Sequence, residues 1–556
     1  MMMENLISLL VLASPAAFAF TALASRFQPG TKPKQLLRLS TAASLLSLLL
    51  AALSGFFVFH HSMLQADLIG FYGIGIGTRL DAISVIMFAM IALIGFIVLK
   101  FSYNYLDGDA RHGVFIGRLA AAIAAVQLLV LSGNLGLLVI AWIMTSMALH
   151  KLLVFYPERP LAVIAARKKF IMARLGDAFL LAAAVLLYLQ FGTGDMEIIF
   201  REIRSAVAAG APAAGVQGAA LFLVLAALLK SAQFPTHGWL IEVMETPTPV
   251  SALLHAGLLN AGPFLILRMA HVIDASSYAL ILLIITGGFT ALFASVVYMT
   301  QTSVKTALSY SSVAHMGFSL MICGMGIYPA AMLHLVAHSF YKAHAFLSSG
   351  SAIDAVRISK FASISRLGSP VRIVSGFILA FAIYAAFSLV WGIDPVWEFG
   401  LLAVGAIIVM GMSTLLVTAL DTPWKPALLF RVGLLVIAVA AAFFTLENLM
   451  KILIADQIPV FTRPGSIETI IITVFLTLFG LVILMQLLAP LLTAKPIYQT
   501  AAIHLRNGLY ANALFDRMVN ALYIHSPGRP KLLVEIADND IPAAPATQKK
   551  FNGRVA

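Results

Sequence analysis

Apolar runs of about 20 residues, the length of helix that crosses a bilayer, recur along this chain from one end to the other. Only 11% of its 556 residues are charged, and 61% are hydrophobic. Soluble domains carry about 25% charged residues, and a soluble core could not cover so much apolar surface. The sequence therefore predicts an all-α polytopic membrane protein whose outer surface faces lipid.

The runs predict about fifteen helices, 14–15 of which would cross the membrane. They are expected near residues 5–25, 38–60, 80–102, 113–131, 133–156, 173–191, 216–243, 248–273, 276–300, 303–325, 328–353, 370–392, 398–420, 426–446 and 466–493. The first run ends in Ala22-Leu23-Ala24, which resembles a signal cleavage site. It lacks a basic start, so it is expected to remain as the first helix.

The formal net charge of +12 is concentrated in short connections between the runs, which is typical of a membrane protein and gives no reason to expect a nucleic-acid partner. The basic residues follow the first, fifth and eleventh runs: Arg26, Lys32, Lys34 and Arg38, then Lys151, Arg159, Arg167, Lys168, Lys169 and Arg174, then Arg357, Lys360, Arg366 and Arg372. The positive-inside rule places these connections on the cytoplasmic side of the membrane. The chain is expected in the inner membrane of a bacterial cell, with its N-terminus outside and its C-terminus in the cytoplasm. The acidic connection with Glu242 and Glu245 fits this bias poorly.

Several helices carry ionisable residues that are costly inside a membrane. These are Asp177, Lys230, His255, Lys305, His315, His334, His338 and Lys342. A single one is commonly an interhelical hydrogen-bond partner or a side chain that reaches the interface. His334, His338 and Lys342 are spaced four residues apart and lie on one helix face, where three titratable groups need a shared polar environment. Lys230 is followed by Pro235, which interrupts the helical hydrogen bonds. Together these features predict a proton or ion path.

The chain divides into a transmembrane domain, residues 1–493, and a polar C-terminal tail, residues 494–556. His504–Tyr523 is predicted to form an amphipathic helix with Leu505, Leu509, Ala513 and Met518 on one side. The tail is either a mobile cytoplasmic segment or a docking segment for a partner.

No cofactor or nucleotide site is expected in this chain. Its one thiol, Cys323, lies within an apolar run, and one thiol cannot hold an iron–sulfur cluster. The glycines of Gly70–Thr78 precede a membrane helix and do not match a nucleotide loop. No cluster of Cys and His occurs at metal-ligand spacing. The chain is therefore expected to transport rather than to catalyse.

Four stretches resemble the antiporter-like subunits of respiratory complex I (subunit L) and of multisubunit cation/proton antiporters. They are Lys230-Ser-Ala-Gln-Phe-Pro-Thr-His-Gly-Trp-Leu240, Glu245-Thr-Pro-Thr-Pro-Val-Ser-Ala-Leu-Leu-His255, Ser303-Val-Lys-Thr-Ala-Leu-Ser-Tyr-Ser-Ser312 and His334-Leu-Val-Ala-His-Ser-Phe-Tyr-Lys342. Thr78-Arg-Leu-Asp81 and Arg174-Leu-Gly-Asp177 also match, and the resemblance covers residues 78–355. It implies inverted helix repeats, each with a broken helix, and a polar axis along the membrane midplane. Lys230 would be the switching lysine, Asp177 its carboxylate partner, and His255, Lys305, His334, His338 and Lys342 members of the path.

The sequence departs from that family at two charged positions. Trp142 is followed by Ile143, where the family has a glutamate, so Lys230 is expected to pair with Asp177 instead. Residues 373–424, which would hold the second-repeat lysine, contain no Lys, Arg or His. The nearest lysine, Lys425, is expected in a connection.

The tail segment His504-Leu-Arg-Asn-Gly-Leu-Tyr-Ala-Asn-Ala-Leu-Phe-Asp516 is similar to that of DabB-type subunits, the membrane half of two-component inorganic-carbon uptake systems. This resemblance implies a proton or sodium current that drives a large soluble, zinc-containing partner of DabA type, which is similar to carbonic anhydrases and hydrates carbon dioxide in the cytoplasm. The alternative is a divergent proton-pumping subunit of complex I or of a multisubunit cation/proton antiporter.

Overall fold

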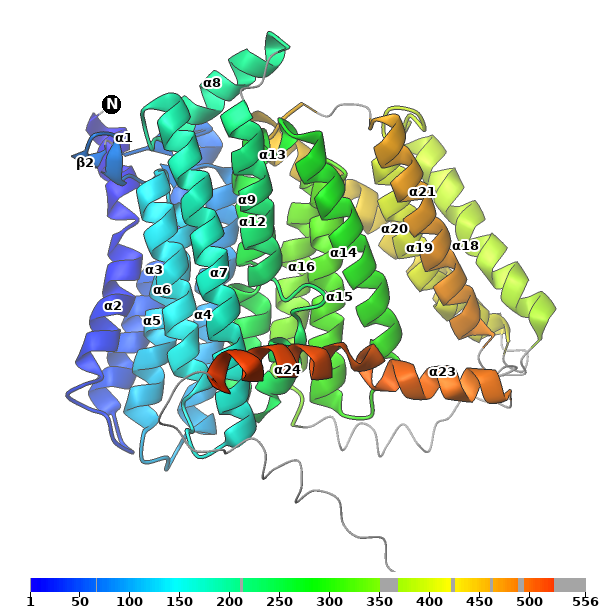
Figure 1. Ribbon diagram of the computed structural model, residues 1–556, viewed down its shortest axis with the longest axis horizontal. Helices are drawn as coiled ribbons and strands as arrows, with labels where there is room; N and C mark the ends of the chain where they lie inside the picture. The colour runs from blue at the N-terminus through cyan, green and yellow to red at the C-terminus, as the bar shows by residue number, and fades with distance from the viewer. Residues whose placement is uncertain are drawn as a thin grey trace, which may run out of the picture. The chain divides into compact units, whose positions relative to one another are not determined.

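The computed structural model describes residues 2–66, 68–210, 214–350, 369–421, 426–460, 464–488 and 495–524. It consists of two compact units, Met1–Asn512 and Ala513–Ala556. The long helices of the first unit run side by side as a bundle (Figure 1). The prediction of an all-α polytopic fold is confirmed.

Most membrane helices of the bundle begin and end close to the predicted runs. Their bounds are α1 Met2–Leu10, α2 Ala13–Ala24, α3 Lys34–His61, α4 Ala82–Tyr105, α5 His112–Leu131, α6 Leu135–Leu153, α7 Pro160–Phe191, α9 Ala214–Lys230, α14 Ser277–Tyr298, α15 Val304–Gly324, α16 Tyr328–Leu347, α18 Pro370–Val390, α19 Phe399–Leu420, α20 Pro426–Ile454 and α21 Ser466–Leu487. However, α7 begins at Pro160 rather than near 173, and α20 ends at Ile454 rather than near 446. Twelve helices of the described chain are long and apolar enough to cross a membrane. Three further predicted ranges are occupied by α9, with 17 residues, and by the more polar α15 and α16.

Besides the first run, which is divided into α1 and α2, two predicted helices in the middle of the chain are interrupted. The range 216–243 contains α9, then an irregular stretch through Pro235, then the short α10 (Gly238–Glu242) and a 3-10 turn, η1 (Val243–Glu245). The range 248–273 contains α11 (Thr248–Leu253), a π-helical turn, η2 (Leu254–Leu258), then α12 (Ala261–Arg268) and α13 (Ala270–Asp274). Proline removes backbone donors, and π-turns commonly mark functional sites. The prediction of broken helices is therefore confirmed at these two places, whereas the inverted relation of the repeats stays a prediction.

Short strands precede α4, where the sequence predicted only a connection. Strands β1 (Leu64–Gln65) and β4 (Arg79–Leu80) pair antiparallel, as do β2 (Ile69–Phe71) and β3 (Ile74–Ile76). Tyr72 and Gly73 both have positive φ angles, as a tight hairpin turn requires. Helix α8 (Met196–Ala208), which follows α7, is an amphipathic helix outside the predicted spans.

Helices α14 and α15 approach each other so closely that glycine is needed at their contact. A Cβ atom added to Gly317 would lie 2.7 Å from the carbonyl oxygen of Gly287, and one added to Gly287 would lie 2.6 Å from that of Gly317. Small residues permit this backbone-to-backbone packing between membrane helices.

Two of the three basic connections lie on one face of the bundle. The amide of Gly113, at the start of α5, donates to the carbonyl of Gly30 at 3.2 Å, and Arg111 pairs with Glu158 at 3.5 Å. Lys168 pairs with Glu242 at 2.5 Å, and the amide of Asn512 donates to the same carboxylate at 2.8 Å. In the acidic connection that fits the charge bias poorly, Glu242 is thus neutralised by the basic segment beside it. Arg357, Lys360, Arg366 and Lys425 lie outside the described residues.

The prediction of one amphipathic helix over His504–Tyr523 is wrong. Helix α23 (Pro496–Arg506) ends before a turn, η4 (Gly508–Tyr510), and α24 (Ala511–Ile524) follows. Gly508, Leu509 and Tyr510 all have positive φ, so the Asn-Gly pair ends the helix. Leu509, Ala513 and Met518 are exposed, and the buried positions of α24 are instead Ala511, Phe515 and Val519.

Candidate functional site

Lys230 is the last residue of α9 and points toward α6. Its ammonium donates to the carbonyl of Trp142 at 3.2 Å, to Oγ1 of Thr145 at 2.8 Å and to Oγ of Ser146 at 2.7 Å. It also lies 4.3 Å from the centroid of the Trp142 ring. A lysine ammonium has three protons to donate, so α6 satisfies all of them with neutral acceptors.

The expected ion pair between Lys230 and Asp177 is not formed. Asp177, on α7, is buried and pairs with Arg174 at 2.6 Å, one turn earlier on the same helix. The cause is local: α6 has Ile143 where a carboxylate would stand, but it offers the hydroxyls of Thr145 and Ser146 just beyond. Helix α7 nevertheless packs against α9, so Asp177 and Lys230 belong to neighbouring helices.

A second lysine joins this cluster. Lys169, on α7, is buried and donates to the carbonyl of Ser146 at 2.5 Å, so Ser146 receives one lysine on its side chain and another on its backbone. The two buried ammonium groups that donate to Ser146 create a strongly positive environment within the bundle. The sequence did not single out Lys169 for this role, because it stands in a run of basic residues at a predicted connection.

Three histidine rings gather between α15 and α16. The ring centroids of His334 and His338 lie 5.2 Å and 5.0 Å from that of His315, and 6.0 Å from each other. Neither ring nitrogen of His338 has a hydrogen-bond partner among the described residues, although the side chain is buried. Buried polar atoms without protein partners are typical of hydrated or functional sites.

The next turn of α16 extends these polar side chains into a row, the α16 row, which consists of His334, His338 and Lys342. Lys342 is fully buried, at 0% exposure, and donates to the carbonyl of Leu308 at 2.9 Å. His255, within the π-turn η2, stacks on Phe346 with 4.3 Å between ring centroids. Asn260 joins the broken helix to α16 by a 2.6 Å hydrogen bond to Ser339. The predicted common face of His334, His338 and Lys342 therefore meets the broken helix.

Lys305 is not brought into this row. It lies in the first turn of α15, ten residues before His315, which corresponds to about 15 Å along a helix. The other candidates form two groups, one around Lys230 and one along α16. Helix α9 packs against α12, and α12 packs against α16, so these helices connect the two groups through the bundle (Figure 1).

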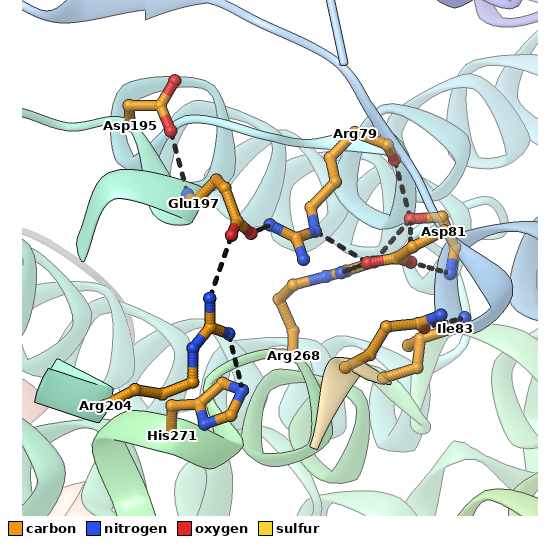
Figure 2. A network of polar contacts seen from close by, with 10 residues as sticks. Arg79, Asp81, Ile83, Asp195, Glu197, Arg204, Arg268 and His271 are labelled. Atoms are coloured by element: carbon orange, nitrogen blue, oxygen red, sulfur yellow. Dashed lines mark hydrogen bonds and ion pairs between the residues drawn. The ribbon is translucent and has the colours of Figure 1, made fainter. Parts of the chain in front are cut away.

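A separate ion network holds the end of the broken helix, as Figure 2 shows. Asp81, which caps α4, pairs with Arg268 at 2.5 Å and with Arg79 at 2.7 Å. Arg79 also pairs with Glu197 of α8 at 2.6 Å. Burial alone would raise the pKa of Asp81, but Arg268 and Arg79 outweigh it and hold that pKa well below its usual range.

The outer part of this network is neutral at His271. Burial, together with Arg204 and Arg79, lowers the pKa of His271 to about 4. The uncharged ring lies 3.4 Å from the guanidinium of Arg204, which in turn pairs with Glu197 at 3.1 Å (Figure 2). The network thus fixes α4, α8 and the α12–α13 junction to one another. Of its members, the sequence pointed to Arg79 and Asp81 only through a family motif.

A bundle with broken helices and a buried row of lysines and histidines defines the class of antiporter-like membrane subunits. Residues 132–419 match the transmembrane family model of NADH:quinone oxidoreductase and Mrp antiporter subunits, and residues 68–116 match that of the complex I chain 5 N-terminus. The chain belongs to this family.

The similar proteins include subunits of inorganic-carbon transporters. The chain is 34% identical over 464 residues to the probable inorganic carbon transporter subunit DabB2 of Halothiobacillus neapolitanus, covering 82% of each chain. It is 39% identical over 317 residues to the probable subunit DabB of Hydrogenovibrio crunogenus, covering 57% of this chain and 60% of that protein. The resemblance to DabB-type subunits is therefore confirmed.

A solved structure shows the same fold. The Mrp complex from Dietzia sp. DQ12-45-1b contains a chain with a TM-score of 0.61 and 21% identity; the match covers 95% of this chain and 61% of that one. At this identity the likeness concerns the fold.

Proposed function

We propose that this chain is the cation-translocating membrane subunit of a two-component inorganic-carbon uptake system. In this proposal protons or sodium ions pass through the chain down their gradient, and their flow drives a partner that converts carbon dioxide to bicarbonate. The chain itself transports and does not catalyse.

The proposal rests on Lys230, which lies within the bundle and whose ammonium makes three hydrogen bonds but no close ion pair with any described residue. Its ammonium is held by two hydroxyls and a carbonyl rather than by a carboxylate. Neutral acceptors do not fix the charge as a carboxylate would, so the group can exchange its proton at lower cost than a buried ion pair. The α16 row and the broken helix beside it extend the polar groups through the bundle, as a proton relay needs.

The partner in this proposal is a large soluble, zinc-containing subunit of DabA type on the cytoplasmic side. Zinc and the hydration of carbon dioxide belong to that partner, where a metal-bound water can act as the nucleophile. No cofactor is assigned to this chain. The names of the DabB-type relatives describe inorganic carbon transporter subunits, which supports the transport role proposed for this chain.

The orientation follows from the charged face. Residues 26–38 and 151–174 lie on the face that also receives Asn512, so this face is assigned to the cytoplasm of a bacterial inner membrane. The N-terminus is then outside, and helix α23 offers exposed side chains such as Ile497 and Ile503 to a cytoplasmic partner. These residues are the proposed docking segment.

Accumulation of labelled inorganic carbon tests the function. Cells that express this chain with its soluble partner should lose accumulation at least tenfold when Lys230 is replaced by methionine. The matched control is Lys100→Met, which removes an exposed lysine from α4 and should leave accumulation unchanged. Undiminished accumulation in Lys230→Met would contradict the proposal. Cation/proton antiport in vesicles without any carbon accumulation by the wild type would favour the alternative, an antiporter or respiratory subunit.

A further inference from the structure

A cavity of about 300 Å³ lies where the chain turns from α15 into α16. Its described lining comes from that turn, from the start of α19 and from the end of α20 with the segment after it. Its lining includes Pro329, Glu398, Glu447, Lys451, Ala455 and Ile458. The cavity has no part in the Lys230 cluster described above.

Glu447 is the unusual member of this lining. Its side chain is only 6% exposed, and among the described residues it makes no hydrogen bond and no close ion pair, although Lys451 attracts its charge and Glu398 repels it from a greater distance. The other two charges of the cavity satisfy each other, because Lys451 pairs with Glu398 at 3.1 Å and both are partly exposed. A carboxylate without a close counter-ion is expensive inside a membrane helix, and a protonated carboxyl there costs less. The surroundings of Glu447 therefore favour its protonated form, and the proton can come from the cavity.

The cavity is placed at one end of the α16 row. Pro329 lines it, and His334 follows five residues later, about 7.5 Å along the helix. Gln457 stands between the lining residues Ala455 and Ile458 and accepts a 3.0 Å hydrogen bond from the amide of Ile83. Ile83 lies two residues after Asp81 of the ion network, at the end of α4 away from the basic connections (Figure 2). The cavity thus lies about one and a half helical turns before the first histidine of the row, and one hydrogen bond joins the segment that lines it to the start of α4.

We propose that this cavity is a proton-access site on the face opposite the basic connections, with the Glu447 carboxylate as its proton-exchanging group. The ion-paired Glu398 and Lys451 form its rim, and the turn before α16 contributes no titratable side chain among the described lining residues. Hard metal cations take about six oxygen ligands, which one free carboxylate does not supply. The ligand is therefore the proton. This inference rests on the proposed translocation and supplies its entry point.

Proton flux into liposomes that contain the full-length chain with its soluble partner is the first test. Glu447→Gln, which keeps the shape but not the exchangeable proton, should lower the flux at least tenfold, and Glu447→Asp should restore at least a third of it. The control is Glu468→Gln, which removes an acidic side chain from a neighbouring cavity and should leave the flux unchanged. An unchanged flux in Glu447→Gln, with wild-type flux present, would overturn the inference and leave the proposed function standing.

Carbodiimide labelling separates the inference from the proposed function. This reagent modifies protonated carboxyl groups in apolar surroundings, and peptide mass spectrometry locates the product. Labelling of Glu447 in the purified wild type should fall as the pH is raised and should be insensitive to sodium chloride. Such labelling without any flux would support the access site while the translocation proposal fails. Absence of labelling at every pH, or protection by sodium ions alone, would overturn the assignment of a proton site.

Discussion

Buried charges in this chain are stabilised in two different ways. Asp81 is completely buried and lies between two guanidinium groups, so its charge is fixed in place. The Lys230 ammonium donates its hydrogen bonds to neutral acceptors alone and makes no close ion pair with a described residue. Removing one member of a buried ion pair leaves the other charge uncompensated, whereas a cation held by hydroxyls can lose its proton without leaving an anion behind. The first arrangement suits a structural anchor and the second suits a translocation site.

Asp81→Asn should destabilise the protein by about 3–5 kcal/mol, because it leaves Arg268 without a counter-ion. Thermal unfolding of the purified protein measures this change, and Asp107→Asn, an exposed aspartate, should shift stability by less than about 0.5 kcal/mol. The folded-state pKa of Asp81 is depressed, so its contribution is fully present above about pH 4 and is lost only as the pH falls further. The difference between wild type and variant should therefore be constant from pH 6 to 8. Equal stability of the two proteins would contradict the assigned role.

The sequence predicted much of the site at the residue scale, but not its contacts. The four-residue spacing of His334, His338 and Lys342 was sufficient to place them on one face, because helix geometry alone decides it. The partner of Lys230 could not be predicted, since hydroxyls and backbone carbonyls occur on every helix and give no distinct pattern. Glu447 was missed because its importance depends on a cavity formed by segments that are distant in sequence.

At the scale of elements, prolines and glycines determine where the helices break and how closely they pack. Pro235 correctly predicted an interruption after Lys230, because proline lacks a backbone donor. The π-turn around His255 has no such marker and depends on packing against α16. The tail helix was predicted as continuous from its apolar spacing, but the left-handed conformation of Gly508 and its two neighbours divides it.

Gly317→Ala tests the close contact of α14 and α15. The added methyl group would lie 2.7 Å from a backbone oxygen and 2.8 Å from the amide of Ala291, so the helices must separate. We expect a loss of about 1–3 kcal/mol in the free energy of unfolding. Gly411→Ala, in an open position within α19, is the control and should be neutral or stabilising by up to about 1 kcal/mol. Thermal unfolding in detergent measures both, and equal behaviour of the two variants would show that the contact is not as close as described.

At the scale of the whole molecule, charge and hydropathy predicted the class of protein and the common face of two basic segments. Glu242 and Glu245 appeared to break the charge bias, but Glu242 is neutralised by Lys168 from the facing segment. The charge rule considers connections singly and cannot include such pairing. The same face carries Asn512, so the C-terminal segment and the broken helix after Lys230 meet at one carboxylate.

We propose that cations flow through this chain down their gradient and that this flow drives carbon accumulation. A membrane potential contributes about 2.3 kcal/mol per charge per 100 mV, which changes an equilibrium roughly fifty-fold. The most direct measurement is accumulation of labelled inorganic carbon in cells that express this chain and its soluble partner, before and after a protonophore and a sodium ionophore are added, with ATP held constant. The account predicts that accumulation collapses to the level of cells without the chain. Accumulation that continues under complete uncoupling, at the same ATP level, would contradict it.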